Sequence, residues 1–233
     1  MKTPYGYCDL RVERVNDDII DAYIEHGYSI IAVNTTLNCS LLGNVNSNKK
    51  KRKFAECNDE NDEEKDWVPT PKLINDNYSK LTILNRLTIQ ITNIGQLQKI
   101  DIVTSPSVDI ITCNMKTSIT PKDYTIAIEK NIYFEISYCP MLFNSNIRQD
   151  TFTLAHLLYI KGKSKNLIIT SGAANKLDIR NPHDVMNLGI LLGLSRKLSM
   201  KSITQGCYSI ILKSYGRKLG KSAIHLKPVN NNS

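Results

Sequence analysis

Residues 170–195, TSGAANKLDIRNPHDVMNLGILLGLS, hold the side chains whose order best suggests a ligand-binding loop. An apolar run ends at Ser171 and Gly172, a loop with Lys176 and Arg180 follows, and then comes a helix rich in small residues. Bases and backbone N–H groups at a helix start can bind phosphate. The loop has neither GxGxxG nor GxxxxGK, so it matches known nucleotide loops weakly. It is either an enzyme's phosphate-binding turn or a unit that holds RNA while another molecule does the chemistry.

Residues that bind metals or act as nucleophiles are scattered. The four histidines show no HxH, HxxxH or HExxH spacing, and the six cysteines form no CxxC pair. Scattered cysteines are typical of free thiols in a reducing compartment. Asp9 lies in an early apolar run, and Glu135 lies in a late one, where it could be the structural partner of a base. We found no paired carboxylates and no nucleophile–base set, so we expect no catalytic residue, no metal and no cofactor.

Basic residues are concentrated in the last third of the chain. Residues 148–233 hold 14 Lys or Arg and three acids, whereas residues 1–147 hold 16 bases and 19 acids. This imbalance predicts a polyanionic partner, most often a nucleic acid, whose phosphates contact exposed bases. The candidate RNA-binding residues are Arg148, Lys163, Lys165, Lys176, Arg180, Arg217, Lys218 and Lys221.

These bases are expected in two regions. Arg148 and Arg180 follow the ends of adjacent strands and would share one end of a parallel sheet, whereas the bases between Lys161 and Lys165 precede a strand and would lie at the opposite end. Arg180 could instead pair with a carboxylate such as Asp178 or Asp184. No run of 18 apolar residues occurs, so we expect no membrane partner.

Short apolar runs alternate with helical stretches. The expected strands are residues 5–12, 28–34, 86–92, 108–114, 132–140 (closed by Pro140), 166–172 and 208–214. The expected helices are residues 16–27 (capped by Asn16 and ended by Gly27), 121–131, 148–163 and 182–195, with a helical turn at 199–207. This alternation predicts an α/β fold with a parallel sheet, either a (β/α) barrel or a doubly wound open sheet.

Helix 182–195 has a specific pattern of large and small residues. Pro182 suits its first turn. The residues at helical spacing that should face the sheet are Val185, Leu188, Leu191 and Leu192. Gly189 and Gly193 lie four residues apart, so one face should let a neighbouring backbone approach closely.

Two places break the alternation. Residues 44–80 hold five consecutive bases followed by a run of acids, which predicts an exposed, disordered insertion. The five bases are candidates for a nuclear-localisation signal and are Lys49, Lys50, Lys51, Arg52 and Lys53. Apolar runs 100–103 and 108–111 are separated by four residues, which is too few for the crossover that parallel neighbours need.

Several stretches together resemble a known family. The sequences TPYGYCDLRV, YSIIAVN, LTILNRLTI, IYFEISYCPML, IRQDTFTLAHLL, KGKSKNLIITSGA, LDIRNPHDVMNLGILLGLS and GRKLGKSAIHLKP occur in this order. They resemble the 30-kDa protein subunit of eukaryotic ribonuclease P and ribonuclease MRP over nearly the whole chain apart from the insertion. The order of eight motifs is far more specific than any one of them.

The resemblance implies a single TIM-like (β/α) barrel domain, residues 1–233, related to the PHP metallohydrolases. It implies a non-catalytic subunit of a ribonucleoprotein that removes 5′ leaders from precursor tRNA, with an RNA subunit supplying catalysis. The implied partners are the ribonuclease P RNA, the MRP RNA, a Pop-type ferredoxin-like small subunit and the other protein subunits. The implied location is the nucleus and nucleolus.

The chain departs from the family in three places. Arg148, Gln149 and Asp150 stand where the family shows Arg-Arg-Tyr, so one base is lost and an acid gained. Residues 180–184 read Arg-Asn-Pro-His-Asp where the family has Arg-Gly-Pro-Tyr-Asp, so the arginine and the helix start are kept. The family's crossover helix is missing near residues 104–107. The alternatives are a PHP-type metal-dependent phosphoesterase, disfavoured by the missing ligands, and a free-standing RNA-binding protein, disfavoured by the absence of RRM, KH and zinc-knuckle motifs.

Overall fold

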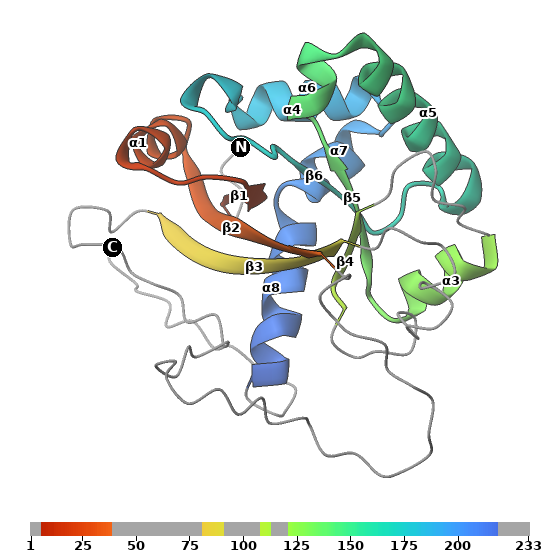
Figure 1. Cartoon of the computed structure of the whole chain (residues 1–233). Coiled ribbons are helices and arrows are strands. Elements are labelled where there is room, and N and C mark those ends of the chain that lie inside the picture. The colour runs from red at the N-terminus through yellow and green to blue at the C-terminus, as the bar shows by residue number, and fades with distance from the viewer. Residues whose placement is uncertain (1–5, 39–80, 91–107, 113–120, 219–233) are drawn as a thin grey trace, which may run out of the picture.

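A computed structural model describes residues 6–38, 81–90, 108–112 and 121–218. Its elements in chain order are β1 (Tyr7–Val12), α1 (Asp17–Glu25), β2 (Tyr28–Asn38), β3 (Thr82–Gln90), β4 (Ile110–Thr112), α3 (Pro121–Glu129), β5 (Tyr133–Ser137), α4 (Cys139–Phe143), α5 (Ser145–Gly162), β6 (Leu167–Thr170), the 3-10 helix η3 (Lys176–Asp178), α6 (Pro182–Leu191), α7 (Arg196–Ser202) and α8 (Gln205–Lys218) (Figure 1). None of the helices placed in these ranges has both the length and the apolar character that a membrane crossing requires.

The strands form two parallel three-stranded sheets, β1-β2-β3 and β4-β5-β6. The sheets meet where β1 lies beside the end of β6: Gly172 N donates to Arg11 O at 2.9 Å, and Glu13 N donates to Ala173 O at 2.8 Å. At the other side, β3 and β4 meet through side chains, because Arg86 Nη2 donates to Thr112 Oγ1 at 3.3 Å. The expected parallel α/β class is confirmed, but the described residues do not form a closed barrel ladder.

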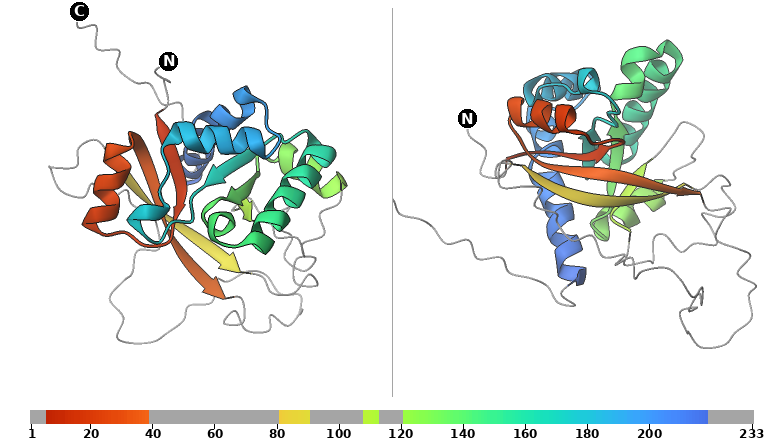
Figure 2. Two further views of the ribbon diagram at one scale, coloured as in Figure 1. Left: turned by 90° about the horizontal axis from the view of Figure 1, so that it is seen from above. Right: turned by 60° about the vertical axis from the view of Figure 1, so that its left-hand side comes forward.

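Alternate residues of the strands face different surroundings, as the two-residue period of a strand requires. On β5, Phe134 and Ile136 pack outward against helices α3, α5 and α6. The ring of Tyr124 from α3 stacks on Phe134 with 4.5 Å between centroids. Tyr133 and Glu135 point to the opposite, inner face of the curved sheets, where Tyr133 packs with Ile168 of β6. Helices therefore cover the outer face of the sheets, and a different element must pack on the inner face (Figure 2).

Helix α8 fills the amino-terminal part of this inner face. Its Cys207, Ile210 and Ile211 are buried against Cys8 and Leu10 of β1, together with residues of β2, β5 and β6. The prediction of a strand at 208–214 was therefore wrong. The buried positions recur at intervals of three and four residues, which is helical spacing, but a seven-residue apolar window does not separate the two periods. The described chain has six strands, not seven.

Other elements begin or end a few residues away from their predicted boundaries. β2 extends to Asn38, β3 begins at Thr82, and β5 ends at Ser137 because Pro140 lies in the first turn of α4. The predicted caps of α1 are confirmed: Asn16 accepts from Ile19 N at 3.0 Å, and Gly27 follows the helix with φ +79°. Cys8, Cys139 and Cys207 are free thiols, as expected. The predictions for insertion 44–80, for Lys49–Lys53, for the run 100–103 and for the missing helix near 104–107 fall outside the described residues.

Helix α6 packs closely on α7 at Gly189, but the nearest atoms belong to side chains and not to the neighbouring backbone that the sequence predicted. A Cβ on Gly189 would lie 2.2 Å from Ser199 Oγ and 3.0 Å from Ile169 Cδ1. Gly193 has another role, because it takes φ +91° after the helix and nothing lies within 4 Å of its Cβ position. Leu191 was expected to face the sheet but is 69% exposed. It lies six residues after the buried Val185, about 240° around the helix, so it cannot share that face.

The close contact at Gly189 gives a test of this packing. We expect Gly189→Ala to lower the free energy of unfolding by about 1 to 3 kcal/mol, because the added methyl group forces α6 and α7 apart. The matched control, Asn187→Ala at an exposed position of the same helix, should stay within about 0.5 kcal/mol of the wild type. Urea unfolding measures both, and equal stability of the two variants would contradict the packing described.

Candidate functional site

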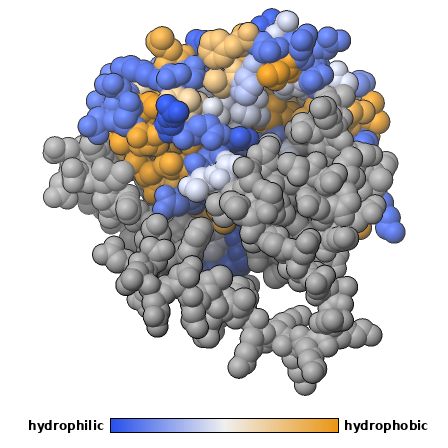
Figure 3. Space-filling model, in the orientation of Figure 1, coloured by the Kyte–Doolittle hydropathy of each residue, from blue (hydrophilic) through white to orange (hydrophobic). Residues whose placement is uncertain are grey.

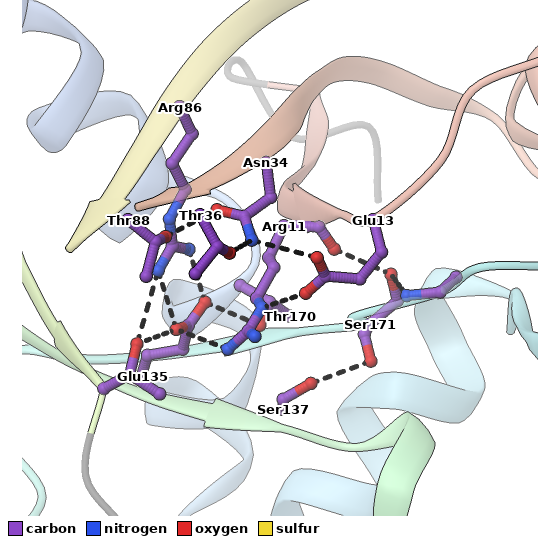
Figure 4. A network of polar contacts seen from close by, with 12 residues as sticks. Arg11, Glu13, Asn34, Thr36, Arg86, Thr88, Glu135, Ser137, Thr170 and Ser171 are labelled. Atoms are coloured by element: carbon purple, nitrogen blue, oxygen red, sulfur yellow. Dashed lines mark hydrogen bonds and ion pairs between the residues drawn. The ribbon is translucent and has the colours of Figure 1, made fainter. Parts of the chain in front are cut away.

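Glu135 is the centre of a polar network at the carboxyl ends of the strands (Figure 4). The residue is 1% exposed. Its carboxylate accepts hydrogen bonds from Arg86 Nη1 at 2.5 Å and from Arg86 Nη2 at 2.8 Å, one on each oxygen. The hydroxyls of Thr112 and Thr170 also donate to it, the latter at 2.8 Å. A carboxylate offers about four acceptor positions. Arg86, Thr112 and Thr170 therefore occupy all of them.

The charge of Glu135 is stabilised by these partners. Burial alone would raise its pKa, but the hydrogen bonds and charge of Arg86, with the charge of Arg11, hold the pKa below its usual value. Arg11 Nη1 lies 3.5 Å from Glu135 Oε2. Glu135 is therefore an ionised structural partner of two bases, as the sequence interpretation allowed, and it holds no proton to donate near neutral pH.

The network continues across β1, β2 and β3. Arg11 Nε donates to Glu13 Oε1 at 2.6 Å, and Asn34 Nδ2 donates to Glu13 Oε2 at 2.9 Å. Thr88 Oγ1 in turn donates to Asn34 Oδ1 at 2.5 Å. Figure 4 shows these side chains pointing toward one another from both sheets. Two arginines face two glutamates, so the network is balanced in charge.

Asp9 has a different environment although it lies on the adjacent part of β1. It is 2% exposed and accepts from Tyr23 Oη at 2.8 Å, Ser171 N at 3.1 Å and Arg11 N at 3.1 Å. Burial raises the pKa of Asp9, and these hydrogen bonds offset the rise only in part. Its partners are neutral groups, so it stabilises the turn after β6 rather than an ion pair.

The turn that begins the 170–195 stretch is fixed from both sides. Ser171 Oγ donates to Arg11 O at 3.0 Å and accepts from Ala173 N at 3.0 Å. Gly172 has φ +65°, and a Cβ there would lie 2.4 Å from Ser137 Oγ, so the turn requires glycine on both grounds. The hydroxyl of Ser171 therefore has a structural role in a rigid strand-to-loop junction.

Metal-ligating residues are not gathered in the part of the chain that the structure describes. Within it, no group of three or more His, Cys, Asp or Glu side chains is placed to hold a metal ion. His26, His156 and His183 belong to three different helices or their caps. The acceptor oxygens of buried Asp9 and Glu135 are occupied by the donors given above.

The predicted bases at the carboxyl end have unequal surroundings. Arg148 donates from Nε to Met141 O at 2.9 Å and from Nη2 to Leu142 O at 3.1 Å, so it also caps the end of α4. Lys176 is exposed at the start of η3.

Arg180 combines a fixed backbone with an exposed side chain. Its N–H donates to Tyr138 Oη at 3.1 Å, and its carbonyl accepts from Tyr28 Oη at 2.9 Å. Within the described ranges its guanidinium forms no ion pair, and Asp178 instead accepts from the loop backbone at Asn175 N, 3.1 Å away. The alternative pairing with Asp178 or Asp184 is therefore not found, and the side chain is directed by a rigid loop.

The remaining predicted bases also differ in their surroundings. Lys163 ends α5 with φ +53°, and its Nζ lies 5.1 Å from the ring centroid of Tyr159. Arg217 forms a two-pronged ion pair with Asp109, with one contact at 2.5 Å. Lys218 is exposed at the end of α8, and Lys221 lies outside the described residues. The roles of all these bases in RNA binding stay predictions.

Sequence reasoning missed Arg86 as the partner of Glu135. The available signal was that each is a lone charge inside an apolar strand, LTILNRLTI and IYFEIS. Lys213 was also missed: its ammonium donates to Val108 O, Lys130 O and Asn131 O at 3.1 to 3.3 Å, which joins α8 to the residues that precede β4 and β5. Nothing in the sequence around Lys213 distinguishes it from other helix lysines.

Fold and site define a parallel α/β protein, compatible with a TIM-like arrangement, whose strand ends hold a charge-balanced network. The chain belongs to the RNase P subunit p30 family, whose model matches residues 100–219. It is 37% identical over 93 residues to the ribonuclease P protein subunit p30 of Mus musculus, covering 40% of this chain and 35% of the mouse protein. It is 40% identical over 92 residues to the Arabidopsis thaliana protein GAMETOPHYTE DEFECTIVE 1, covering 40% of this chain and 16% of that protein.

Two further comparisons extend this result. The probable ribonuclease P protein subunit 3 of Schizosaccharomyces pombe is 29% identical over 93 residues, which is 40% of each chain. The chain thus spans well under half the length of these curated relatives. A chain in the cryo-EM structure of archaeal ribonuclease P with mature tRNA matches with a TM-score of 0.57 and 14% identity, covering 96% of this chain and 99% of that one. This likeness concerns the fold alone.

The two glutamates of the network give a matched stability test. We expect Glu135→Gln to lower the free energy of unfolding by about 3 to 5 kcal/mol, because two guanidinium groups then lose a buried counter-charge. Glu13→Gln removes the same charge from a side chain that is 31% exposed, and should cost about 1 kcal/mol or less. Denaturant unfolding of both variants at pH 7 tests this, and similar losses would show that Glu135 is not the centre of the network.

The raised pKa of Asp9 predicts that its contribution to stability decreases as the pH rises. Folding holds the Asp9 proton more tightly, so its contribution to stability is complete below about pH 4, the unfolded pKa, and is lost as the pH rises through the folded pKa. Asp9→Asn keeps an acceptor for Ser171 N and Arg11 N and removes the charge. We expect it to be at least as stable as the wild type at pH 7 and to lose less stability between pH 4 and pH 7.

The control for this test is Asp21→Asn at an exposed position of α1, which corrects for the loss of one charge. Unfolding curves at a series of pH values measure the difference. A wild type that is clearly more stable than Asp9→Asn at pH 7 would mean that the Asp9 carboxylate stabilises the fold as an anion.

Proposed function

We propose that the chain is a protein subunit of ribonuclease P that binds the RNA subunit and supports removal of 5′ leaders from precursor tRNA. Membership of the RNase P subunit p30 family is the observation that carries this proposal. The relatives in mouse and fission yeast are named as ribonuclease P subunits. The basic last third of the chain supports an RNA partner.

The interior supports a non-catalytic role for the protein. Parallel barrel enzymes place their reacting groups at the carboxyl ends of the strands. Here that position is occupied by Glu135, whose acceptor positions are filled by Arg86, Thr112 and Thr170. A general base must have a free lone pair within reach of a proton, and Glu135 has none. In this proposal the RNA subunit supplies the catalytic groups.

RNA contact is proposed to occur at the loop that leads from β6 to α6. Arg180 and Lys176 are exposed, and hydrogen bonds to Tyr28 and Tyr138 fix the backbone of Arg180. A fixed backbone lowers the entropy lost when a side chain binds. The remaining predicted bases, Arg148, Lys163, Lys165, Arg217, Lys218 and Lys221, are part of the same proposal.

Protein partners and location are part of the same proposal. A Pop-type small subunit and the MRP particle are proposed partners, and the exposed side chains of Phe143, Ile147 and Leu177 supply apolar contact surface. Figure 3 shows that apolar residues are exposed among polar ones on one face of the molecule. Lys49–Lys53 are proposed to direct the chain to the nucleus and nucleolus. Replacing all five with alanine should shift a fluorescent fusion toward the cytoplasm, and an unchanged distribution would assign import to another segment or to a partner.

The test of the proposed function is a pull-down of the tagged full chain followed by RNA sequencing. We expect strong enrichment of the ribonuclease P RNA over total RNA, and enrichment of MRP RNA if that particle shares the subunit. The purified chain alone should leave precursor tRNA intact with or without divalent metal. Absence of ribonuclease P RNA from the pull-down, or cleavage by RNA-free protein that Asp9→Ala abolishes, would overturn the proposal.

Arg180 provides a residue-level prediction. Arg180→Ala should weaken association with the ribonuclease P RNA and flatten its salt dependence by about one phosphate contact. Because the side chain is exposed, the free energy of unfolding should change by less than about 1 kcal/mol. Filter binding at several salt concentrations measures the slope. An unchanged slope and affinity, or an unfolded variant, would make the loop purely structural.

A further inference from the structure

A second candidate site lies at the amino-terminal ends of β5 and β6, away from the Arg180 loop. A hollow of about 320 Å³ opens there between the turn after α5 and the junction of α7 with α8. The residues that line it are Tyr133, Ser164, Lys165, Asn166, Leu167, Leu198, Lys201 and Gly206. Its size is near the lower end for ligand pockets, which suits a small group rather than a large cofactor.

The charged residues that line the hollow are all basic. Lys165 comes from the turn and Lys201 from α7, both residues are exposed, and the lining contains no acid. Within the described ranges, neither lysine is part of an ion pair. Gly206 is the second residue of α8, and a helix start carries a partial positive charge. The hollow is therefore suited to an anion.

Ser164 points independently to a ligand. The residue is 4% exposed and lines the hollow, yet its hydroxyl forms no hydrogen bond with any residue that the structure describes. A buried hydroxyl without a partner destabilises the fold. A bound acceptor in the hollow would remove that cost.

The turn that carries Ser164 is held rigidly. Tyr124 Oη donates to Lys165 O at 2.6 Å, and Asn166 Nδ2 donates to Ile132 O at 3.3 Å. Lys163, Ser164 and Asn166 all have φ between 50° and 53°, a conformation that non-glycine residues rarely adopt. The neighbouring helix and strand therefore hold the backbone of this turn in place before any ligand binds.

We propose that this hollow binds a phosphate group through the ammonium groups of Lys165 and Lys201 and the hydroxyl of Ser164. The same chemistry fits a phosphate of an RNA backbone and free inorganic phosphate. The RNA source rests on the proposed function. In that case the chain contacts RNA at both ends of its strands, through Arg180 at one end and through this hollow at the other.

The first arm of the test titrates the full chain with inorganic phosphate and follows the amide signals of Ser164 and Gly206 by NMR. Saturable shifts are expected in the wild type. Lys201→Ala should weaken binding by about tenfold, since a hydrogen bond to a charged group contributes about 1.5 kcal/mol or more. Lys122→Ala, at an exposed position of α3 outside the lining, is the matched control and should bind as the wild type does.

Ser164→Ala separates binding from folding. If phosphate accepts from the hydroxyl, the variant binds phosphate more weakly while its melting temperature in phosphate-free buffer is unchanged or higher, because an unpaired buried hydroxyl has been removed. Wild-type protein without saturable shifts, or Lys201→Ala and Ser164→Ala that both bind phosphate like the wild type, would overturn the proposal.

The second arm identifies the source of the phosphate with a short RNA hairpin. If inorganic phosphate competes with the hairpin and Lys201→Ala lowers the salt slope by about one contact, the source is RNA. If Lys201→Ala weakens inorganic phosphate binding but leaves hairpin binding unchanged, the site takes free phosphate. Neither arm depends on recovery of the ribonuclease P RNA, so the hollow and the proposed function can fail separately.

Discussion

The buried ion pair between Arg86 and Glu135 joins the two sheets where the described residues contain no backbone ladder. Arg86 belongs to β3 and Glu135 to β5, and both guanidinium nitrogens contact the carboxylate. Burying two charges is costly unless the geometry is good and the remaining lone pairs are satisfied. The threonines of β4 and β6 meet that condition, so the four strands hold one relative position. On the opposite side, β1 and the chain after β6 are joined by backbone hydrogen bonds.

This arrangement divides the inner face into two parts. The amino-terminal part is apolar and is filled by α8, and the carboxyl-terminal part is polar and filled by its own ion pairs. Neither part leaves a reactive carboxylate free among the described residues. The groups that remain open to ligands are instead on the rims: the exposed Arg180 on a rigid loop, and the lysines around the hollow near β5 and β6. In the proposed function, the fold binds RNA at its rims rather than a substrate in its interior.

The sequence predicted the parallel α/β class because its strands are continuous apolar runs separated by helices with clear caps, such as Asn16 before α1. The prediction failed at α8, because Ile210 and Ile211 fit either a strand or a helix within a short window. The choice between strand and helix depends on the space left between the two sheets. The role of Glu135 could be anticipated in kind, but its partner could not, because Arg86 is 49 residues away. The hollow could not be predicted from the sequence either, since Lys165 and Lys201 both line it only because α7 packs on the sheet.

The most direct test replaces the central ion pair with apolar residues of similar size, Arg86→Met with Glu135→Leu, in the tagged full chain. Exchanging a whole buried pair in this way is often neutral or stabilising. Arg11 keeps Glu13 as its partner. If the interior is structural and RNA binds at the rims, the double variant should fold, as circular dichroism and thermal unfolding would show, and recover the ribonuclease P RNA as well as the wild type does. A folded double variant that no longer recovers this RNA would contradict the account, because the interior pair would then be part of the functional site.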